Sequence, residues 1–449
     1  MSDRTGGVVP LGVAARVWWS IALRSFGGPA GQIAVMHQEL VERRRWVGER
    51  RFLHALSFCT VLPGPEAQQL AVYLGWLLNG TAGGLIAGTL FVLPGYLALL
   101  ALSIAYVAWG DTTGVEGLLA GIAPAVIAIV VQALWRIGRR TLRHHVAVGL
   151  AAGAFVALAV VGLPFPLVIA AAAAVGLAAG RLRPGWVAGP SAGTDDGPAP
   201  LLADDAGPGV VASWGRAARI VGLGVVVWFA PVAVAAVAFG RSHVLVDQGL
   251  FFSGTALVTF GGAYAVLSFV ARQAVDVHGW LLPGEMVHGL ALAETTPGPL
   301  VLVLEFVGFL GAHRAPGTLD PWVAGTLGAT IVVWVTFVPC FLLVFLGAPH
   351  VESLRRNAIV ASAFAGVSAA VVGVIANLAL FFALHTLFDR TTRAESGPVA
   401  VELPVWSSLD VPALGIAVLA AVLVFRRRWG VPSVLAVCGA LGVAVQLVS

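Results

Sequence analysis

Apolar residues occur in blocks of two lengths along the chain, and the length of a block indicates how it lies in a membrane. The long blocks approach or exceed the roughly 20 residues that a transmembrane helix needs. They cover Thr81–Val107, Gly117–Trp135, His145–Val161, Phe165–Ala179, Trp214–Phe239, Val323–Leu346, Ala358–Leu384, Leu409–Phe425 and Val431–Val448. The pattern predicts an all-α integral membrane protein.

Shorter apolar blocks come in pairs on either side of helix-breaking motifs. Phe26–Gly28 and Pro63–Pro65 each interrupt an apolar region. The flanking blocks of roughly 11 to 15 residues are too short to span a bilayer alone. Because glycine pairs and prolines disrupt helices, we expect broken helices whose halves meet within the membrane.

These broken segments are duplicated. Four landmarks recur at a constant offset of 234 positions: Phe26–Gly28, Trp46, His54 and Pro63–Pro65 return as Phe260–Gly262, Trp280, His288 and Pro297–Pro299. A unit of this length is too long for a solenoid module. The sequence therefore predicts two structural repeats with broken helices at the same motifs.

The repeats divide the chain into four expected segments. Residues 1–143 form the first repeat, and residues 144–240 form connecting transmembrane helices with a flexible cytoplasmic linker at 183–213. The linker is rich in Gly, Pro, Ala and Asp, which is typical of a flexible segment. Residues 241–384 form the second repeat, and residues 385–449 a C-terminal loop with two transmembrane helices.

Composition excludes several classes of protein. Apolar residues make up 59% of the chain and charged residues 11%, against about 25% charged in soluble domains. Mean hydropathy is +0.92, which fits a chain solvated mostly by lipid. Cys59, Cys340 and Cys438 are isolated, so neither a zinc site nor a dithiol is indicated. The arginines cluster at membrane edges, and nucleic acid is not an expected partner.

Arginine placement favours one topology over another. All 26 basic residues are arginine. If the broken pairs are re-entrant hairpins, all but five arginines lie on the cytoplasmic side, in agreement with the positive-inside rule. The exceptions are Arg241, Arg272, Arg314, Arg390 and Arg393. Fully spanning pairs would instead place Arg136 and its neighbours outside. Because five spans then separate the two sets of hairpins, we expect the second repeat to be inverted.

The breaks also predict what the protein binds. Inverted repeats with interrupted helices are typical of secondary transporters, and the interruptions point to the substrate site. Each half-helix directs a partly positive end toward a break, and such ends bind anions. These half-helices begin after Gly28, Pro65, Gly262 and Pro299. We expect four such ends, two from each side, to surround one oxyanion.

Long and ordered motifs surround the breaks. They are Ser25–Pro29, Arg44–Trp46, Leu62–Leu70 with Tyr73 and Gly75–Trp76, Gly83–Gly84, Phe91–Pro94 and Glu294–Pro299. Together they resemble the chromate ion transporter family over nearly the whole chain, as in its long two-domain members. The resemblance implies export of chromate, a tetrahedral dianion similar to sulfate, across the cytoplasmic membrane by the proton motive force.

The implied partners are chromate or a similar oxyanion, protons and the lipid bilayer. No cofactor, metal or catalytic residue is expected, and a homodimer is left open. Glycines let an anion approach the backbone, while arginine, hydroxyl and amide side chains can donate hydrogen bonds to it. The candidate substrate-binding residues are Arg24, Ser25, Gly27, Gly28, Gln32, Gly64, Gln69, Thr259, Gly261, Gly262, Thr295, Thr296 and Gly298.

Two carboxylates are candidates for proton coupling, because carboxylates within a membrane are costly and usually functional. Glu66 follows Pro65 at the start of a half-helix, where the alternative role is to cap the helix dipole. Glu294 lies three residues before Pro297 and is nearer to its break than Glu305.

Other polar residues have two interpretations each. Arg24 either pairs with the dianion or lies with Arg16 on the wet face of an interfacial helix. The equivalent His54 and His288 either pack against backbone or relay protons. The side-chain amides of Gln32, Gln68 and Gln69 either donate hydrogen bonds to an oxyanion or join the half-helices to one another.

Three candidate functions follow from the sequence. The first is chromate export by alternating access of two inverted halves. The second is transport of sulfate or a related oxyanion, which has nearly the same shape as chromate. The third is a membrane enzyme that reduces Cr(VI), for which the sequence carries no dinucleotide fingerprint, haem-ligand pattern or redox cysteine pair.

Overall fold

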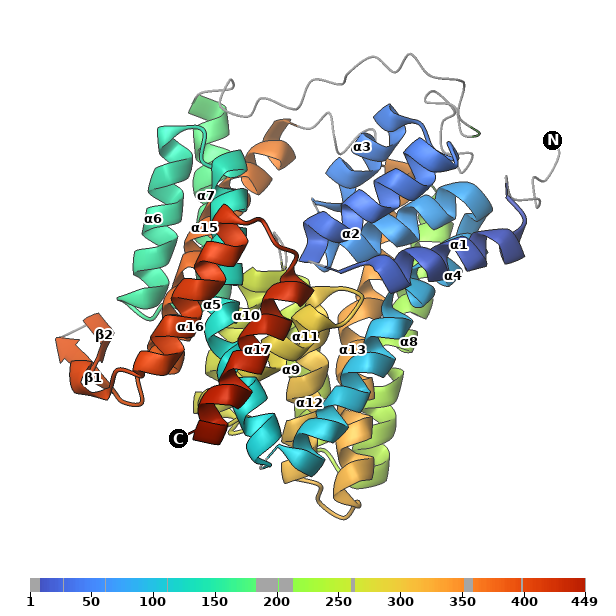
Figure 1. Cartoon of the computed structure of the whole chain (residues 1–449). Coiled ribbons are helices and arrows are strands. Elements are labelled where there is room, and N and C mark those ends of the chain that lie inside the picture. Colours follow the sequence, from blue (N-terminus) through green and yellow to red (C-terminus); the bar gives the residue numbers. More distant parts are fainter. Residues whose placement is uncertain are drawn as a thin grey trace.

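Helices make up most of the described part of the chain (Figure 1). The computed structural model describes residues 9–26, 28–60, 62–110, 112–182, 201, 213–259, 263–350, 358–396 and 399–448. The linker predicted at 183–213 lies outside these residues, apart from Leu201 and Ser213. The predicted fold class, an all-α integral membrane protein, is confirmed.

The first repeat begins with two pairs of short helices. One pair flanks the first glycine break, and the other flanks Pro63–Pro65. The bounds are Leu11–Arg24 for α1, Gly28–His37 for α2 with a π-helical continuation over Gln38–Arg43, Glu49–Cys59 for α3 and Glu66–Trp109 for α4. Asn79 and Gly80 leave the helical conformation and kink α4. The kink separates a half-helix from a long span, where the sequence predicted the division.

The second repeat has the same order of elements. The bounds are Val244–Val258 for α9, Ala263–Arg272 for α10 with a π-helical continuation over Gln273–Val277, Glu285–Thr295 for α11, a 3₁₀ turn at Leu300–Leu302 and Val303–Arg314 for α12. The π-helical ends are equivalent in detail. The N–H of Trp46 bonds to the carbonyl of Leu40 at 2.8 Å, and the N–H of Trp280 bonds to that of Ala274 at 2.7 Å.

Seven helices within the described ranges are long and apolar enough to cross a membrane. They are α4, α5 (Thr113–Thr141), α7 (Phe165–Leu182), α8 (Trp214–Phe239), α13 (Pro321–Gly347), α15 (Ala358–Leu387) and α17 (Val431–Val448). Three further apolar helices of the described chain are shorter: α6 (His145–Ala159), α9, and α16 (Val411–Ala421) with a π-helical continuation over Val422–Arg426. Other short turns are the 3₁₀ segments Ala348–His350 and Trp406–Ser408.

Small residues let the long helices approach closely. Gly121 of α5 faces the backbone of α17 at Cys438 and Gly442, and Gly176 of α7 faces Gly366 of α15. Any added Cβ at these positions would overlap the facing backbone. Close packing of this kind replaces the hydrophobic driving force that helices lack in lipid.

The apolar core has two parts. One cluster is built from α1 to α4 of the first repeat. It also includes Val344, near the end of α13, and Ala348, which directly follows α13. The other cluster contains the second repeat together with α5 to α8 and the C-terminal helices. The short helices of the first repeat therefore form a body of their own, seated on a larger one.

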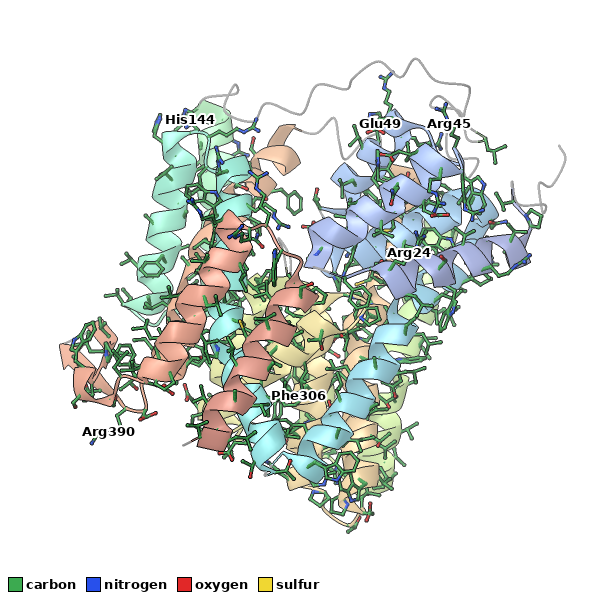
Figure 2. The ribbon with its side chains drawn as sticks, in the orientation of Figure 1. Arg24, Arg45, Glu49, His144, Phe306 and Arg390 are labelled. Carbon is green, nitrogen blue, oxygen red and sulfur yellow. The ribbon has the colours of Figure 1, made fainter. Side chains whose placement is uncertain are left out.

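The two ends of the molecule differ in structure. His144, Arg45 and Glu49 lie at one end and Arg390 at the opposite end (Figure 2). At the Arg390 end the predicted C-terminal loop contains an antiparallel hairpin, with β1 at Thr391–Ser396 and β2 at Val399–Pro404. The prediction of a plain loop missed these strands, whose Thr and Val residues favour extended backbone.

Candidate functional site

The first glycine break meets the second Pro-Gly-Pro turn. The backbone N–H of Gly298 donates to the carbonyl of Ser25 at 2.9 Å. Gly298 has φ +107°, a conformation that glycine adopts readily and other residues do not. The turn thereby presents its N–H to a carbonyl that the end of α1 leaves without a helical partner.

The second glycine break meets the first Pro-Gly-Pro turn in the same way. The N–H of Gly64 donates to the carbonyl of Thr259 at 2.7 Å, and Gly64 has φ +117°. Ser25 and Thr259 are equivalent residues, as are Gly64 and Gly298, because each pair is 234 positions apart. The two repeats are therefore joined by reciprocal hydrogen bonds at their breaks.

The hydroxyl groups beside the breaks bond within their own helices. The hydroxyl of Ser25 donates to the carbonyl of Ile21 at 2.7 Å, and that of Thr259 donates to Thr255 at 2.7 Å. Thr295 and Thr296 donate to carbonyls three residues earlier, at 2.7 and 2.9 Å. Among the four, Ser25, Thr259 and Thr296 are buried. These hydroxyls shape the helix ends, and each still has an oxygen that can accept a hydrogen bond.

Each Pro-Gly-Pro turn packs against a proline-containing long helix. Gly95 follows Pro94 in α4 and faces the carbonyl of Pro297 so closely that an added Cβ would overlap it. An added Cβ at Gly64 would lie 2.7 Å from the Sγ of Cys340, which follows Pro339 in α13. The long spans and the breaks therefore meet at one level of the structure.

Buried amides surround the same region. The Nε2 of Gln32 donates to the carbonyl of Gly298, and the Nε2 of Gln69 donates to the carbonyl of Pro63 at 2.6 Å. Neither polar atom of Gln68, nor the Oε1 atoms of Gln32 and Gln69, has a hydrogen-bond partner among the described residues. Because a buried unpaired amide is costly, these groups point to water or a polar ligand between the breaks.

The two predicted coupling carboxylates occupy different surroundings. Glu66 begins α4 directly after Pro65 and is partly exposed. Glu294 lies in the last turn of α11, is 3% exposed and accepts a hydrogen bond from the hydroxyl of Tyr264 at 2.5 Å. Glu305, the weaker candidate from sequence, is fully buried, and its two oxygens have no partner among the described residues.

The structure describes only some of the glycines that the sequence predicts at the two breaks. Gly28 begins α2 with φ +71°. Gly27, Gly261 and Gly262 lie outside the described residues. The four-fold convergence of half-helix ends therefore stays a prediction for the second glycine break.

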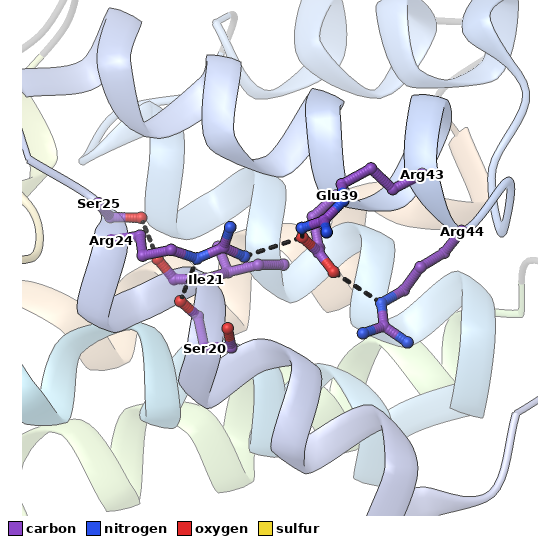
Figure 3. Close-up of polar contacts among 7 residues, drawn as sticks. All are labelled: Ser20, Ile21, Arg24, Ser25, Glu39, Arg43 and Arg44. Carbon is purple, nitrogen blue, oxygen red and sulfur yellow. Dashed lines mark hydrogen bonds and ion pairs between the residues drawn. The ribbon is translucent and has the colours of Figure 1, made fainter.

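Arg24 does not stand alone beside the first break. Its Nη2 lies 2.8 Å from the Oε2 of Glu39, which also accepts from Arg43 at 3.1 Å, while the Oε1 accepts from Arg44 at 2.8 Å (Figure 3). Burial raises the pKa of Glu39, but the hydrogen bonds from Arg24 and Arg44 outweigh it and lower the pKa to about 2. The sequence reasoning missed Glu39, although an acidic residue inside an apolar half-helix was a signal for it.

A cavity of about 460 Å³ is lined mainly by residues of α4, α5, α11 and α12. On its wall, Glu285 accepts two hydrogen bonds of 2.7 Å from Arg314. The hydroxyl of Tyr106 lies 3.2 Å from Glu285 and 3.3 Å from the Nδ1 of His288. His288 therefore has the hydroxyl of Tyr106 as a side-chain partner, and its role as a proton relay stays a prediction.

Comparison with known proteins shows to which family this chain belongs. The chromate transporter family matches residues 13–177 and 246–443. The chain belongs to the chromate transporter family. It is a multi-pass membrane protein of a transporter family, and family membership supports chromate as its substrate.

Individual relatives agree with this membership. A chromate transport protein of Pseudomonas aeruginosa is 31% identical over 416 residues, which cover 91% of this chain and 85% of the relative. A probable chromate transport protein of Synechococcus elongatus is 29% identical, with 82% and 83% covered. A chromate transport protein of Cupriavidus metallidurans is 28% identical, with 82% and 81% covered. No solved structure matches the chain.

The matched residues cover most of both repeats of this chromate transporter family member and leave out residues 178–245 between the two matched ranges. Every candidate site residue, from Arg24 to Gly298, lies within the matched ranges. The helix α8 lies in the segment left out. The features shared with the family are therefore the broken helices and the long spans around them.

Proposed function

We propose that this protein exports chromate across the cytoplasmic membrane by alternating access of two inverted repeats, driven by the proton motive force. The observation that carries the proposal is the reciprocal pair of hydrogen bonds, from Gly298 to Ser25 and from Gly64 to Thr259. Each bond joins a break in one repeat to a break in the other. A movement of one repeat against the other must therefore change the surroundings of any ligand held between the breaks.

The chemistry of the breaks supports a tetrahedral dianion as cargo. The starts of α2 and α4 supply backbone N–H groups with a partly positive field. Amide groups of Gln32, Gln68 and Gln69 lie beside them. Such neutral donors bind a dianion and still release it, because they neutralise its charge only partly.

Proton coupling is proposed for Glu66 and Glu294. Both lie within a few residues of a Pro-Gly-Pro turn, so a change in their charge acts directly on a bound dianion. Protonation of either carboxylate removes repulsion between it and the anion. The charge state of these carboxylates would therefore couple proton binding to anion binding at the breaks.

Uptake into everted membrane vesicles tests the proposed function. Chromate uptake should be saturable and should fall when the proton gradient is collapsed, and excess sulfate should compete only weakly. Vesicles that carry the protein but take up no more chromate than control vesicles would contradict chromate transport. Equal uptake of chromate and sulfate would instead favour a general oxyanion transporter.

The proposed re-entrant arrangement of the broken helices has a separate test, by labelling of single cysteines in a background that lacks Cys59, Cys340 and Cys438. We expect Thr81→Cys, beside the kink in α4, to react from the cytoplasmic side and Gly114→Cys to react from outside. The opposite pattern would mean that the broken segments cross the membrane fully and are not re-entrant.

A further inference from the structure

The cluster around Glu39 carries more positive charge than its carboxylate neutralises. Three guanidinium groups contact one carboxylate, at 2.8 Å from Arg24, 3.1 Å from Arg43 and 2.8 Å from Arg44 (Figure 3). Three positive charges and one negative charge leave a net charge of +2. A tetrahedral dianion has the charge that would complete this cluster.

The carboxylate and the guanidinium groups differ in their access to solvent. The side chain of Glu39 is 5% exposed, whereas those of Arg24, Arg43 and Arg44 are 41%, 61% and 40% exposed. Each guanidinium has five N–H donors. Arg24 uses its Nε toward the carbonyl of Ser20 at 3.1 Å and its Nη2 toward Glu39. An anion in solution therefore reaches the arginines from their exposed side, opposite the buried carboxylate.

The cluster lies next to the first glycine break in the sequence. Arg24 is the last residue of α1, and the next residue, Ser25, holds the N–H of Gly298 from the second repeat. Glu39 belongs to the neighbouring half-helix of the same repeat. A change of partner at Arg24 therefore acts directly on the contact between the repeats.

The equivalent positions of the second repeat lack these charges. Residues 234 positions after the members of the cluster are Val258, Gln273, Val277 and His278, in place of Arg24, Glu39, Arg43 and Arg44. Among the four, none carries a fixed charge. The excess of positive charge is therefore a property of one face of the protein, the face that the arginine distribution places in the cytoplasm.

We propose that Arg24, Arg43 and Arg44 form a capture site for the oxyanion on the cytoplasmic face, and that Glu39 is a built-in counter-ion which the anion displaces from Arg24. The proposal rests on the function proposed above and adds a loading step to it. Arginine suits this role, because its planar donors match the oxygens of a tetrahedral anion. Glu39 keeps the arginines in position when no anion is bound and lowers the affinity enough for the anion to move on.

Nearby acids do not take part in this pairing. His37 lies 3.2 Å from Glu42 and 2.6 Å from Glu49, on the same pair of short helices. Because the pKa of Glu39 is about 2, its carboxylate stays ionised at any pH that a cell meets. The displacement of Glu39 by chromate is therefore a competition between anions and does not depend on protonation.

Kinetics in everted vesicles test the capture site. The substitution Glu39→Gln removes the competing charge and keeps the shape. It should lower the KM for chromate by about tenfold, the scale of one hydrogen bond to a charged group. Arg44→Gln should raise the KM by a similar factor. The matched control is Glu42→Gln, three residues further on, which removes an acid that pairs with His37 and should leave the KM unchanged.

The outcomes separate this proposal from the proposed function. Wild-type vesicles without chromate uptake would contradict the function itself. Normal wild-type uptake with an unchanged or raised KM in Glu39→Gln would overturn the capture site alone.

If Glu39→Gln does not reach the membrane, Glu39→Asp keeps the charge but draws it back from Arg24. A lowered KM in that variant supports the proposal, and an unchanged KM overturns it. The effect should be the same at pH 6 and pH 8, and a pH-dependent effect would contradict a competition between anions.

Discussion

The two repeats share a backbone but not the side chains attached to it. In both, the residue before the glycine break accepts a hydrogen bond from the central glycine of the other repeat's Pro-Gly-Pro turn. In both, the half-helix after the break ends in a π-helical turn. Duplication has thus preserved the geometry that a broken helix needs in a membrane, where every freed backbone group requires a partner.

The chemistry has diverged on this common backbone. At equivalent positions the first repeat has Arg24, Gln32 and Glu66 where the second has Val258, Val266 and Leu300. Conversely, the second repeat has Tyr264 and Glu294, which form a hydrogen bond, where the first has Ala30 and Thr60. The comparison teaches that a shared backbone geometry and different polar side chains can coexist in two repeats.

The largest expected effect comes from breaking what the repeats share. Gly64→Ala and Gly298→Ala each place a Cβ where φ exceeds +100°, at a cost of about 1–3 kcal/mol in folding free energy. At Gly64 the new atom would also lie 2.7 Å from the Sγ of Cys340. Both variants should lose most chromate uptake at equal protein level. Gly222→Ala, in open space on α8, is the control. Normal transport by either variant would show that the two breaks are not equivalent.

The next largest effect concerns the carboxylates, which differ between the repeats. Glu66→Gln and Glu294→Gln should each reduce gradient-driven uptake to the level measured without a gradient, because the proton-binding group is lost. Tyr264→Phe should have a smaller effect, since it removes only the 2.5 Å hydrogen bond to Glu294. The measurement is uptake as a function of the imposed pH difference. A variant that keeps the wild-type pH dependence would exclude that carboxylate from coupling.

A moderate effect is expected from Arg24, whose equivalent in the second repeat is the uncharged Val258. Arg24→Ala should raise the KM for chromate by about tenfold, the scale of one charge-assisted hydrogen bond, with little change in the maximal rate. Val258→Ala alters the equivalent residue of the second repeat and should leave the KM unchanged. Equal effects of the two substitutions on the KM would mean that Arg24 is only structural.

The smallest effect is expected where an amide joins the repeats. Gln32→Val introduces the residue of the second repeat and removes the hydrogen bond to the carbonyl of Gly298. The loss should cost about 1 kcal/mol and should appear as a lower melting temperature of the purified protein and a few-fold slower uptake. Faster uptake in this variant would indicate that Gln32 restrains the movement of the repeats.

The sequence predicted the helical spans and the breaks well, because proline, glycine and hydrophobicity act locally. It predicted the kink in α4 at Asn79 and Gly80 and the boundaries around Pro63–Pro65 to within a few residues. The strands β1 and β2 were missed, since strands of 6 residues are too short for a periodic pattern to be distinguished. The partner of Arg24 was also missed, because Glu39 is separated from it by the turn between two half-helices.

The sequence by itself determined that this protein is a membrane transporter with a duplicated pattern of breaks, because the identity of a glycine or proline limits the backbone wherever the residue lies. Only the tertiary structure decided where the freed groups go. Gly64 reaches Thr259, Gly298 reaches Ser25, and Glu39 gathers three arginines. Hydrogen bonds and ion pairs depend on distances between segments that are remote in sequence, and those distances are set by the packing of the whole chain.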